Sequence, residues 1–561
     1  MFWKNICRTK SLDAAAHSPD VEEHQTLSKV LNVKDLTAIG IAAIIGAGVF
    51  SSIGRACFNG GPAVSLLFVF TAITCAFCAL CYAEFASRVP VSGSAYTYAY
   101  VTFGELAAWI IGWNLIMEYA IGNITVAIAW SSNLTSFLGG LGIHLPSYLT
   151  TSYMAAQKAH AEMTQLLALG KEVPESVMRY ADVWQTAPLI GDLHFILNIP
   201  AFVGVSLITA LVYVGIKESK NMTILMVAFK VIVVLFVIII GAFYVNPANW
   251  VPFAPNGLSG VMKGVSAVFF AYIGFDAVST AAEECKDPQR DLPKGMIYSL
   301  LICTGLYVAI SVVLTGMVNY TKLNVGDFLV VAFQSVGLNW LGGILALSAV
   351  IATTSVLLVF QLAQPRIWMV MGRDGLLPKK FAEVHPKFRT PAFATLVMGF
   401  MVAFPALFLD AELATDMNSI GTLFAFAAVC AGILLIPKDS LKPKFSVPYV
   451  SGKIWTPMIL LTIATVLYWN DNNIFANLFS FASQAEFEHN LPYIVFIGLA
   501  ILVSVLSYLK NLSLIPVLGL LSCLYLMTEL GVANWIRFFV WMFVGVVIYL
   551  AYGYKNSKLN K

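Results

Sequence analysis

Long apolar stretches separated by short polar segments run along almost the whole chain. A helix needs about 20 apolar residues to cross the hydrocarbon core of a bilayer, and about fourteen stretches reach or approach that length. We expect these spans at residues 36–57, 63–87, 98–138, 198–216, 221–245, 260–284, 293–318, 338–372, 391–410, 418–437, 454–470, 491–509, 512–529 and 534–554. The pattern therefore predicts an all-α integral membrane protein with about fourteen transmembrane helices.

The polar segments predict how the chain is oriented in the membrane. Residues 1–35 are polar and no short cleavable signal precedes the first span, so we expect this segment to be cytoplasmic. Alternation through the spans then puts most of the 33 lysines and arginines on the inner side, as the positive-inside rule requires. We therefore expect a multi-pass protein of the inner (plasma) membrane, embedded in the lipid bilayer, with both termini in the cytoplasm.

Composition supports this class of protein. Of the 561 residues, 59% are hydrophobic and 11% are charged, whereas soluble domains have roughly 25% charged residues. The net charge of +3 reflects the inner-side excess of lysine and arginine, so it indicates orientation in a membrane and no nucleic-acid partner.

One predicted outer segment, residues 139–197, is longer than the other loops and mixes charged residues with apolar residues at helical spacing. We expect one or two short surface helices there. The segment is interpreted either as a lid or docking element, or as a solvated insertion packed on the outer face, which is the favoured alternative.

Two spans contain residues that interrupt a membrane helix. The first reads "AAIIGAGVFSSIG" at 42–54, and the sixth reads "SAVFFAYIGFDAVSTAAEE" at 266–284. Transporters often consist of two repeats of opposite topology, each with an interrupted helix, although glycines also serve close helix packing. The pattern predicts a ten-helix inverted-repeat core at residues 36–437, followed at 438–561 by four further spans and a short cytoplasmic tail.

An unwound stretch at membrane depth is tolerated where it lines a cavity or where a ligand satisfies its backbone groups. At Gly46, Ala47 and Gly48 the free amide N–H groups and the positive end of a helix dipole favour a carboxylate. Carbonyl groups of the sixth span could accept hydrogen bonds from an ammonium group. The predicted ligand is an α-amino acid, which carries both groups on one carbon.

Lys230 is the only basic residue that we place deep within a span. A lone charged lysine at that depth costs several kcal/mol or loses its proton. Lys230 is therefore interpreted as a proton carrier. The alternative is a lysine permanently bound to backbone carbonyls of the first span.

Two acidic residues lie near the centres of spans. Glu118 has three possible roles: it balances a ligand cation, pairs with the fifth-span lysine, or bonds to helix backbone. Asp276 follows the sixth-span break, where a carboxylate can cap the resumed helix, so we interpret it as mainly structural. Glu283, Glu284 and Arg366 lie near inner span ends; an ion-paired gate is one interpretation there, and ordinary interfacial solvation is the favoured one.

Four stretches together carry a resemblance to a known family. They read "DLTAIGIAAIIGAGVF", "NLIMEYAIG", "FFAYIGFDAVSTAAEECKDPQRDLPKGM" and "QPRIWMVMGRDGLLPKKFAEVHPKFRTPA". Because these four stretches occur together and in this order, the chain resembles the cationic amino acid transporter family of the amino acid, polyamine and organocation superfamily, particularly its bacterial members. The resemblance implies the leucine-transporter-type fold, with five plus five inverted spans and four appended.

The resemblance also implies which residues form the site. The substrate would be held by residues of the two interrupted spans: Ile41, Ile44, Gly46, Ala47, Gly48, Phe270, Ala271 and Ile273. In similar transporters the aromatic residue at the position of Phe270 closes over the substrate from outside. Lys230 matches a fifth-span lysine that occupies the place of a sodium ion in sodium-coupled relatives, with Ser355 nearby, and this supports proton coupling.

We predict a proton-coupled amino acid symporter that works by alternating access. Its specificity would be neutral or broad, because animal members that favour arginine and lysine typically lack the fifth-span lysine. The alternatives are an amino acid exchanger or a cationic amino acid transporter on the same fold and, less favoured, a channel or a sensor. No H-E-x-x-H, G-x-S-x-G or P-loop pattern indicates an enzyme.

No cofactor is expected, and no metal. Cys75, Cys78 and Cys81 lie on one face of the second span, but the sequence provides no fourth ligand or nearby histidine for them.

Overall fold

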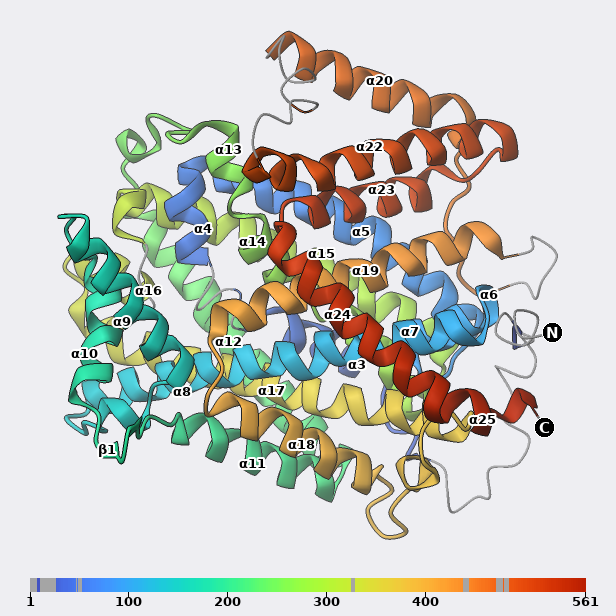
Figure 1. Ribbon diagram of the computed structural model, residues 1–561, viewed down its shortest axis with the longest axis horizontal. Coiled ribbons are helices and arrows are strands. Elements are labelled where there is room, and N and C mark those ends of the chain that lie inside the picture. Colours follow the sequence, from blue (N-terminus) through green and yellow to red (C-terminus); the bar gives the residue numbers. More distant parts are fainter. Residues whose placement is uncertain are drawn as a thin grey trace.

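The computed structural model describes residues 8–10, 27–46, 48, 53–323, 328–436, 443–470, 478 and 484–560. These residues form a bundle of helices, and Figure 1 shows how the helices cross one another at many angles around a central group. Within this described part of the chain the only strands are β1 (Leu189–Ile190) and β2 (Leu193–His194), a short antiparallel hairpin. The prediction of an all-α membrane protein is confirmed.

The helices agree closely with the predicted spans. Those in the region of the first ten spans are α3 (Val33–Ile44), α4 (Ile53–Gly60), α5 (Val64–Arg88), α6 (Ser94–Thr102), α7 (Glu105–Ile116), α8 (Gly122–Gly140), α11 (Ile199–Val214), α12 (Ile216–Ala242), α14 (Val265–Tyr272), α15 (Pro288–Met317), α17 (Gly342–Arg373), α18 (Ala392–Ala406) and α19 (Ala411–Leu435). Nine helical segments of the described chain are long and apolar enough to cross a membrane, and three shorter ones are also apolar. The remaining two predicted spans are the interrupted ones.

Both interruptions are present. The helix α3 ends at Ile44, Ile45 is extended, and the chain becomes helical again in α4. The helix α14 ends at Tyr272, Ile273 is extended, and the 3-10 helix η7 (Phe275–Glu284) follows. Gly274 between them has φ +117, and a Cβ there would lie 2.6 Å from Cβ of Ala43. Glycine is required at this position both by the backbone conformation and by the close approach of the first span.

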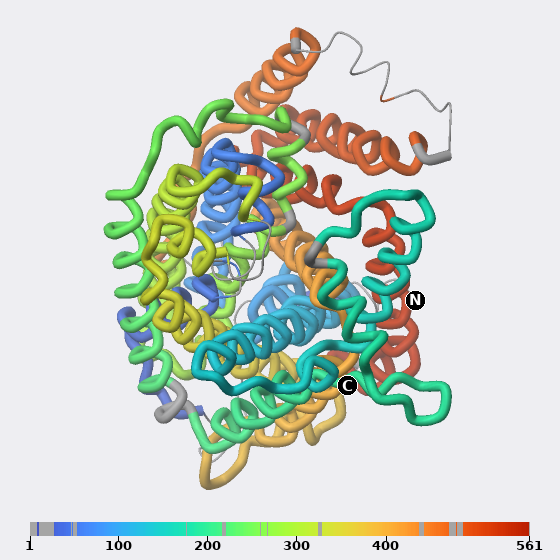
Figure 2. The backbone as a smooth tube through the Cα atoms, turned by 90° about the vertical axis from the view of Figure 1, so that its left-hand side faces the viewer, coloured from blue at the N-terminus to red at the C-terminus, as the bar shows by residue number. Residues whose placement is uncertain are grey.

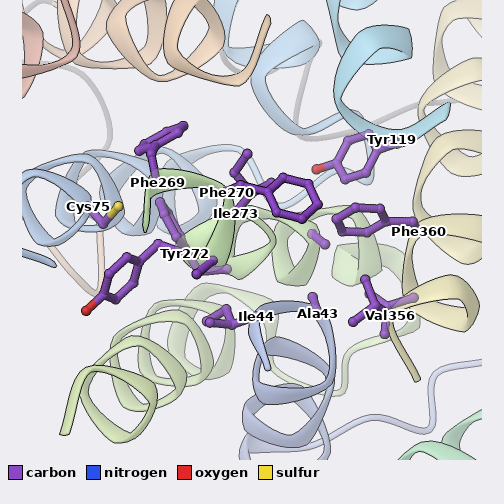
Figure 3. Packing of buried hydrophobic residues seen from close by; sticks show 14 of the residues in the cluster. Ala43, Ile44, Cys75, Tyr119, Phe269, Phe270, Tyr272, Ile273, Val356 and Phe360 are labelled. Carbon is purple, nitrogen blue, oxygen red and sulfur yellow. The ribbon is translucent and has the colours of Figure 1, made fainter. Parts of the chain in front are cut away.

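The interrupted spans occupy the centre of the bundle. The helix α3 packs against α12, α15, α17 and η7, and Figure 3 shows Ala43 and Ile44 opposite Phe270 and Ile273. Buried aromatic residues surround this contact, including Tyr272 on α14. The unwound backbone is therefore enclosed by protein, as a stretch without regular hydrogen bonds must be at membrane depth.

The insertion at residues 139–197 contains α9 (Tyr153–Ala168), α10 (Glu175–Thr186) and the β1–β2 hairpin. It has a small apolar core of its own, in which Ala156, Val183 and Ile196 are buried beside Trp184. Figure 2 shows this segment against one end of the bundle. The prediction of one or two short surface helices is confirmed by α9 and α10.

The described residues after 443 include α20 (Gly452–Asn470), α22 (Gln484–Lys510), α23 (Leu514–Thr528) and α24 (Val532–Ile548). The helix α23 packs against α5 and α19, and Cys523 there has its Sγ atom 3.3 Å from that of Cys78. Farther out, α20 and α22 lie at the edge of the bundle (Figure 1) and expose many large apolar residues. Such surfaces suit contact with lipid.

Candidate functional site

Unwinding of the first span frees backbone carbonyl groups that a continuous helix would satisfy internally. Lys230 on α12 satisfies two of them. Its Nζ atom donates to the carbonyl oxygen of Ile45 at 2.5 Å and to that of Ala42 at 3.0 Å, and it lies 2.7 Å from Oγ of Ser355 on α17. The fifth span thus carries the cation that completes the broken end of the first.

The surroundings of Lys230 fit a protonated side chain. The side chain is fully buried, and the Ser355 hydroxyl donates to the carbonyl oxygen of Ala352 at 2.7 Å, which leaves its lone pairs for the lysine. An ammonium group has three N–H donors and no acceptor, so three acceptors use it fully. Within the described residues no carboxylate forms an ion pair with Lys230, so Glu118 is not its partner.

Tyr307 on α15 connects the two interruptions, and the sequence analysis missed it. Its buried hydroxyl group lies 2.7 Å from the carbonyl oxygen of Ile44 and 2.9 Å from that of Ala271. These carbonyls belong to the last turns before the two breaks. A tyrosine in the middle of the apolar stretch "LICTGLYVAISVV" was the available signal, because a phenol in hydrocarbon needs a hydrogen-bond partner.

The predicted substrate residues gather around the same point. Of these, Ile41, Ile44, Gly46, Gly48, Phe270, Ala271 and Ile273 are buried there, whereas Ala47 lies outside the described residues. A Cβ on Gly46 would lie 2.0 Å from Cγ2 of Val356, and a Cβ on Gly48 would lie 2.4 Å from Cα of Ala271. The backbones of the two interrupted spans are therefore adjacent, which only glycine allows.

A cavity of about 460 Å³ leads from the side of the insertion to Phe270. Thr125 and Asn133 on α8 line it, and the hydroxyl group of Thr125 and the amide nitrogen of Asn133 are buried without a hydrogen-bond partner. Arg55 and Glu412 lie at the same cavity. A cavity of this size is in the range that holds small-molecule ligands, and Phe270, which lines it, directly precedes the Ala271 that Gly48 contacts.

Ion pairs hold the opposite side of the bundle together. Arg366 on α17 lies 2.7 Å from Glu284 on η7, and both side chains are buried. Arg373 contacts both carboxylate oxygens of Glu283 at 2.8 and 3.0 Å. The sequence analysis favoured interfacial solvation for these residues; the structure instead pairs them, because the 3-10 helix η7 brings both glutamates against α17.

The two central acids have surroundings that sequence reasoning did not resolve. Glu118 lies in the π-helix Met117–Ile121, and its buried carboxyl group adjoins that of Asp276. Asp276 accepts a hydrogen bond from the hydroxyl group of Tyr119. Gly274 is at the cap position of η7 and Asp276 lies in its first turn, where the backbone N–H groups of Gly274 and Asp276 lie within hydrogen-bond reach of its carboxylate; the structural role expected for Asp276 stays a prediction.

Comparisons with known proteins identify the family of the chain. The profile of a family described as "Amino acid permease" matches residues 31–502, and one described as "C-terminus of AA_permease" matches residues 512–557.

Individual relatives match over nearly their full lengths. The chain is 37% identical over 560 residues to the branched-chain amino acid permease BcaP of Bacillus subtilis, covering 99% of each chain. It is 35% identical to the methylthioribose transporter of Bacillus subtilis, covering 96% of each. It is 32% identical to the vacuolar cationic amino acid transporter 4 of Arabidopsis thaliana, covering 99% of this chain and 96% of the relative. The predicted resemblance is confirmed, and the chain belongs to the amino acid permease family, a family of membrane transporters and not of enzymes.

Proposed function

We propose that this protein is a proton-coupled amino acid symporter of the plasma membrane that works by alternating access. The observation that carries the proposal is the set of contacts made by Lys230, whose Nζ atom binds the unwound end of α3 at Ala42 and Ile45. The next residue is Gly46, where the substrate carboxylate is proposed to bind. Proton carrier and substrate thus share one short piece of backbone.

The coupling follows from the donor count of lysine. A protonated side chain fills all three acceptors, whereas a neutral amine has one donor fewer and a lone pair of its own. Loss of the proton therefore leaves one of the three acceptors without a donor, and two of the three are carbonyls of the first span, so it is proposed to weaken the attachment of α3 to α12. The protonation of Lys230 and the position of α3 are therefore coupled in free energy. In this scheme, each proton released permits one rearrangement of α3.

The two interrupted spans are proposed to hold the α-carbon groups of the substrate. The amide groups at Gly46 and Gly48 would receive the carboxylate, and carbonyls near Ala271 the ammonium group. Gly48 packs directly against Ala271, so a small zwitterion beside this contact could reach both backbones. Phe270 lines the cavity next to this point, where it would close over the substrate.

For the side chain of the substrate we propose neutral or broad specificity. Apolar residues surround the interruptions, among them Ile41, Ile44 and Ile273. The names of the relatives give three different substrates: branched-chain amino acids, methylthioribose and cationic amino acids. A cationic substrate is the second candidate, because the buried carboxyl groups of Glu118 and Asp276 adjoin one another and neither forms an ion pair with a cation of the described residues.

Lys230→Met tests the coupling in proteoliposomes. We expect the variant to bind substrate but to lose the accumulation that an imposed pH gradient drives into liposomes empty of amino acid. Lys171→Met, on the exposed insertion, is the matched control. An unchanged dependence of uptake on pH in Lys230→Met would exclude the lysine as the proton carrier.

Two further readouts separate the alternatives. An exchanger needs amino acid inside the liposomes, whereas a symporter accumulates substrate without it. The candidate ligands leucine, arginine, alanine and methylthioribose are ranked by how far each raises the temperature of thermal unfolding. Stabilisation by arginine alone would favour the cationic substrate.

A further inference from the structure

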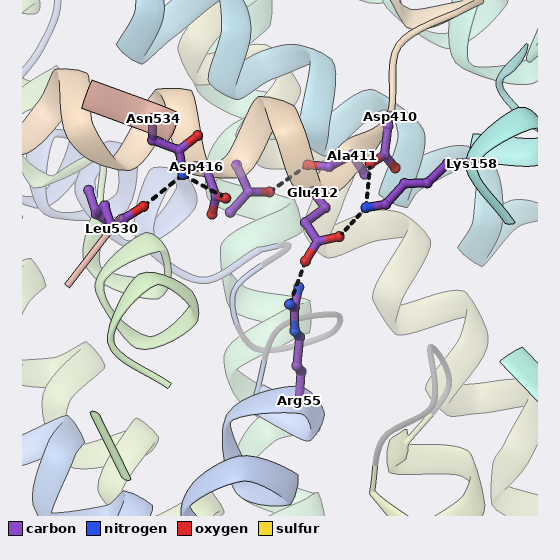
Figure 4. A network of polar contacts seen from close by, with 9 residues as sticks. Arg55, Lys158, Asp410, Ala411, Glu412, Asp416, Leu530 and Asn534 are labelled. Carbon is purple, nitrogen blue, oxygen red and sulfur yellow. Dashed lines mark hydrogen bonds and ion pairs between the residues drawn. The ribbon is translucent and has the colours of Figure 1, made fainter. Parts of the chain in front are cut away.

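The insertion at residues 139–197 contributes a charged residue to the rim of the cavity above Phe270. Lys158 on α9 has its Nζ atom 2.7 Å from Oε2 of Glu412, while Arg55 on α4 has Nη2 2.5 Å from Oε1 of the same carboxylate. Lys158 also lies 3.6 Å from Oδ2 of Asp410. Figure 4 shows the two cations on opposite sides of Glu412. One carboxylate, at the start of α19, is thus shared between two helices.

This shared carboxylate lies where two cavities meet. The cavity above Phe270 is lined by Arg55 and Glu412, and a second one of about 340 Å³, beneath the insertion, is lined by Lys158. Asp410 and Tyr180 border both. A solute that approaches Phe270 along this route passes the charged group.

The insertion is attached to the same part of the bundle as Glu412. The backbone N–H of Met154, at the start of α9, donates to the carbonyl oxygen of Phe408 at 2.9 Å, and that of Asn198 donates to Leu407 at 3.2 Å. Both acceptors directly precede α19. Lys158 and Glu412 therefore sit on segments that are tied to each other.

Arg55 sits on a different kind of segment. The helix α4 has eight residues and is separated from α3 by the interruption. By contrast, α19 is 25 residues long and packs against α5, α8, α23 and α24. If one partner of Glu412 moves away during transport, the short helix beyond the break is the one that can do so, as hinges absorb motion at the ends of elements.

The two cations balance the carboxylate in different ways. Partial burial lowers the pKa of Lys158, but Glu412 and Asp410 outweigh that effect, so the pKa lies above its ordinary value and the side chain stays charged. When Arg55 leaves, Lys158 still neutralises Glu412. The carboxylate is then never left without a counter-charge, and separation of α4 from α19 costs less than it would for an isolated pair.

We propose that the insertion tunes the gate on this face: Lys158 shares Glu412 with Arg55 and thereby weakens the contact that keeps α4 closed against α19. This inference rests on the alternating access proposed above. It predicts opposite effects for two substitutions that each remove one positive charge beside the same carboxylate. Loss of Arg55 opens the cavity, whereas loss of Lys158 leaves Glu412 to Arg55 alone and closes it.

The test measures how fast a membrane-impermeant maleimide labels a cysteine placed at Ala129, which lines the cavity from α8. The native cysteines in the described residues are all buried, and Cys7 is replaced by serine. In proteoliposomes we expect Arg55→Gln to speed labelling and Lys158→Gln to slow it, each by about two- to five-fold as suits solvent-exposed ion pairs. Lys171→Gln, elsewhere in the insertion, should leave the rate unchanged.

A double-mutant cycle separates this mechanism from a general loosening of the insertion. In the Glu412→Gln background, Lys158→Gln should no longer change the labelling rate, because the two residues act through one interaction. Faster labelling in Lys158→Gln, or an effect that persists without Glu412, would overturn the proposal. Labelling of the parent that does not respond to saturating leucine or arginine would instead count against alternating access, which keeps the two failures distinct.

Discussion

The two ends of the bundle are held by ion pairs of opposite character. On the side of the insertion, the side chains of Arg55 and Glu412 are 57% and 40% exposed. On the opposite side, those of Arg366 and Glu284 are 5% and 3% exposed. Exposed pairs contribute little because water and salt compete for both charges, whereas removing one member of a buried pair leaves a charge without compensation. The ion pairs are therefore expected to contribute little to stability at one end of the bundle and much more at the other.

The largest effect is expected from Glu284→Gln. It leaves Arg366 buried without a counter-charge, and we expect the free energy of unfolding to fall by about 3–5 kcal/mol. Thermal unfolding of the purified protein measures the change. The double variant Glu284→Leu with Arg366→Met, which removes both charges, should recover most of the loss. A melting temperature of Glu284→Gln equal to that of the parent would remove the contrast between the two ends.

An intermediate effect is expected from Arg373→Gln. Arg373 makes a two-oxygen contact with Glu283, and the side chains are 18% and 21% exposed. We expect the free energy of unfolding to fall by about 1 kcal/mol, which is the upper end of the range for ion pairs that water reaches. The same thermal unfolding assay applies, with Lys444→Gln, whose pair with Asp287 is more exposed, as the control. A loss as large as that of Glu284→Gln would show that burial is not what distinguishes the pairs.

The smallest effect on stability is expected from Arg55→Gln, within about 0.5 kcal/mol of the parent in the same assay. High salt should weaken the ion pair of Arg55 with Glu412 and so have the same effect on labelling as Arg55→Gln. Raising ionic strength from 0.1 to 1 M shortens the screening length from about 10 Å to about 3 Å, so the labelling of a cysteine at Ala129 should become faster in the parent. A large drop in melting temperature for Arg55→Gln would contradict the assignment of this pair as a weak contact.

The sequence predicted the fold well where local pattern determines it. Each apolar stretch long enough to cross a bilayer became a helix or a broken helix, because hydrocarbon leaves the backbone no other way to satisfy its hydrogen bonds. The breaks at Gly46 and Gly274 were also predictable, since glycine disfavours helix and permits the positive φ found at Gly274. The cap position of the resumed helix is held by Gly274, two residues before Asp276; the exact start of a helix is a weaker signal than its existence.

The candidate site was predicted only in part, for a physical reason. Lys230 stands out because a charge in an apolar span is costly, and its neighbour Ser355 entered through the family resemblance. Tyr307 did not stand out, since its partners at Ile44 and Ala271 lie far away in the sequence and are contacted through backbone atoms that every residue has. Contacts such as that of Lys158 with Glu412 depend on how the insertion folds back over the bundle, and no local pattern specifies that.

The contacts of Lys230 with the broken end of α3 carry a consequence for how the protein responds to its medium. A positive charge at that point is covalently part of the chain, so it cannot be diluted, washed out or replaced by another ion from solution. The occupancy of the position is constant, and only its protonation can change. Under the proposed coupling, transport would respond to acidity and would need no dissolved cation at that position.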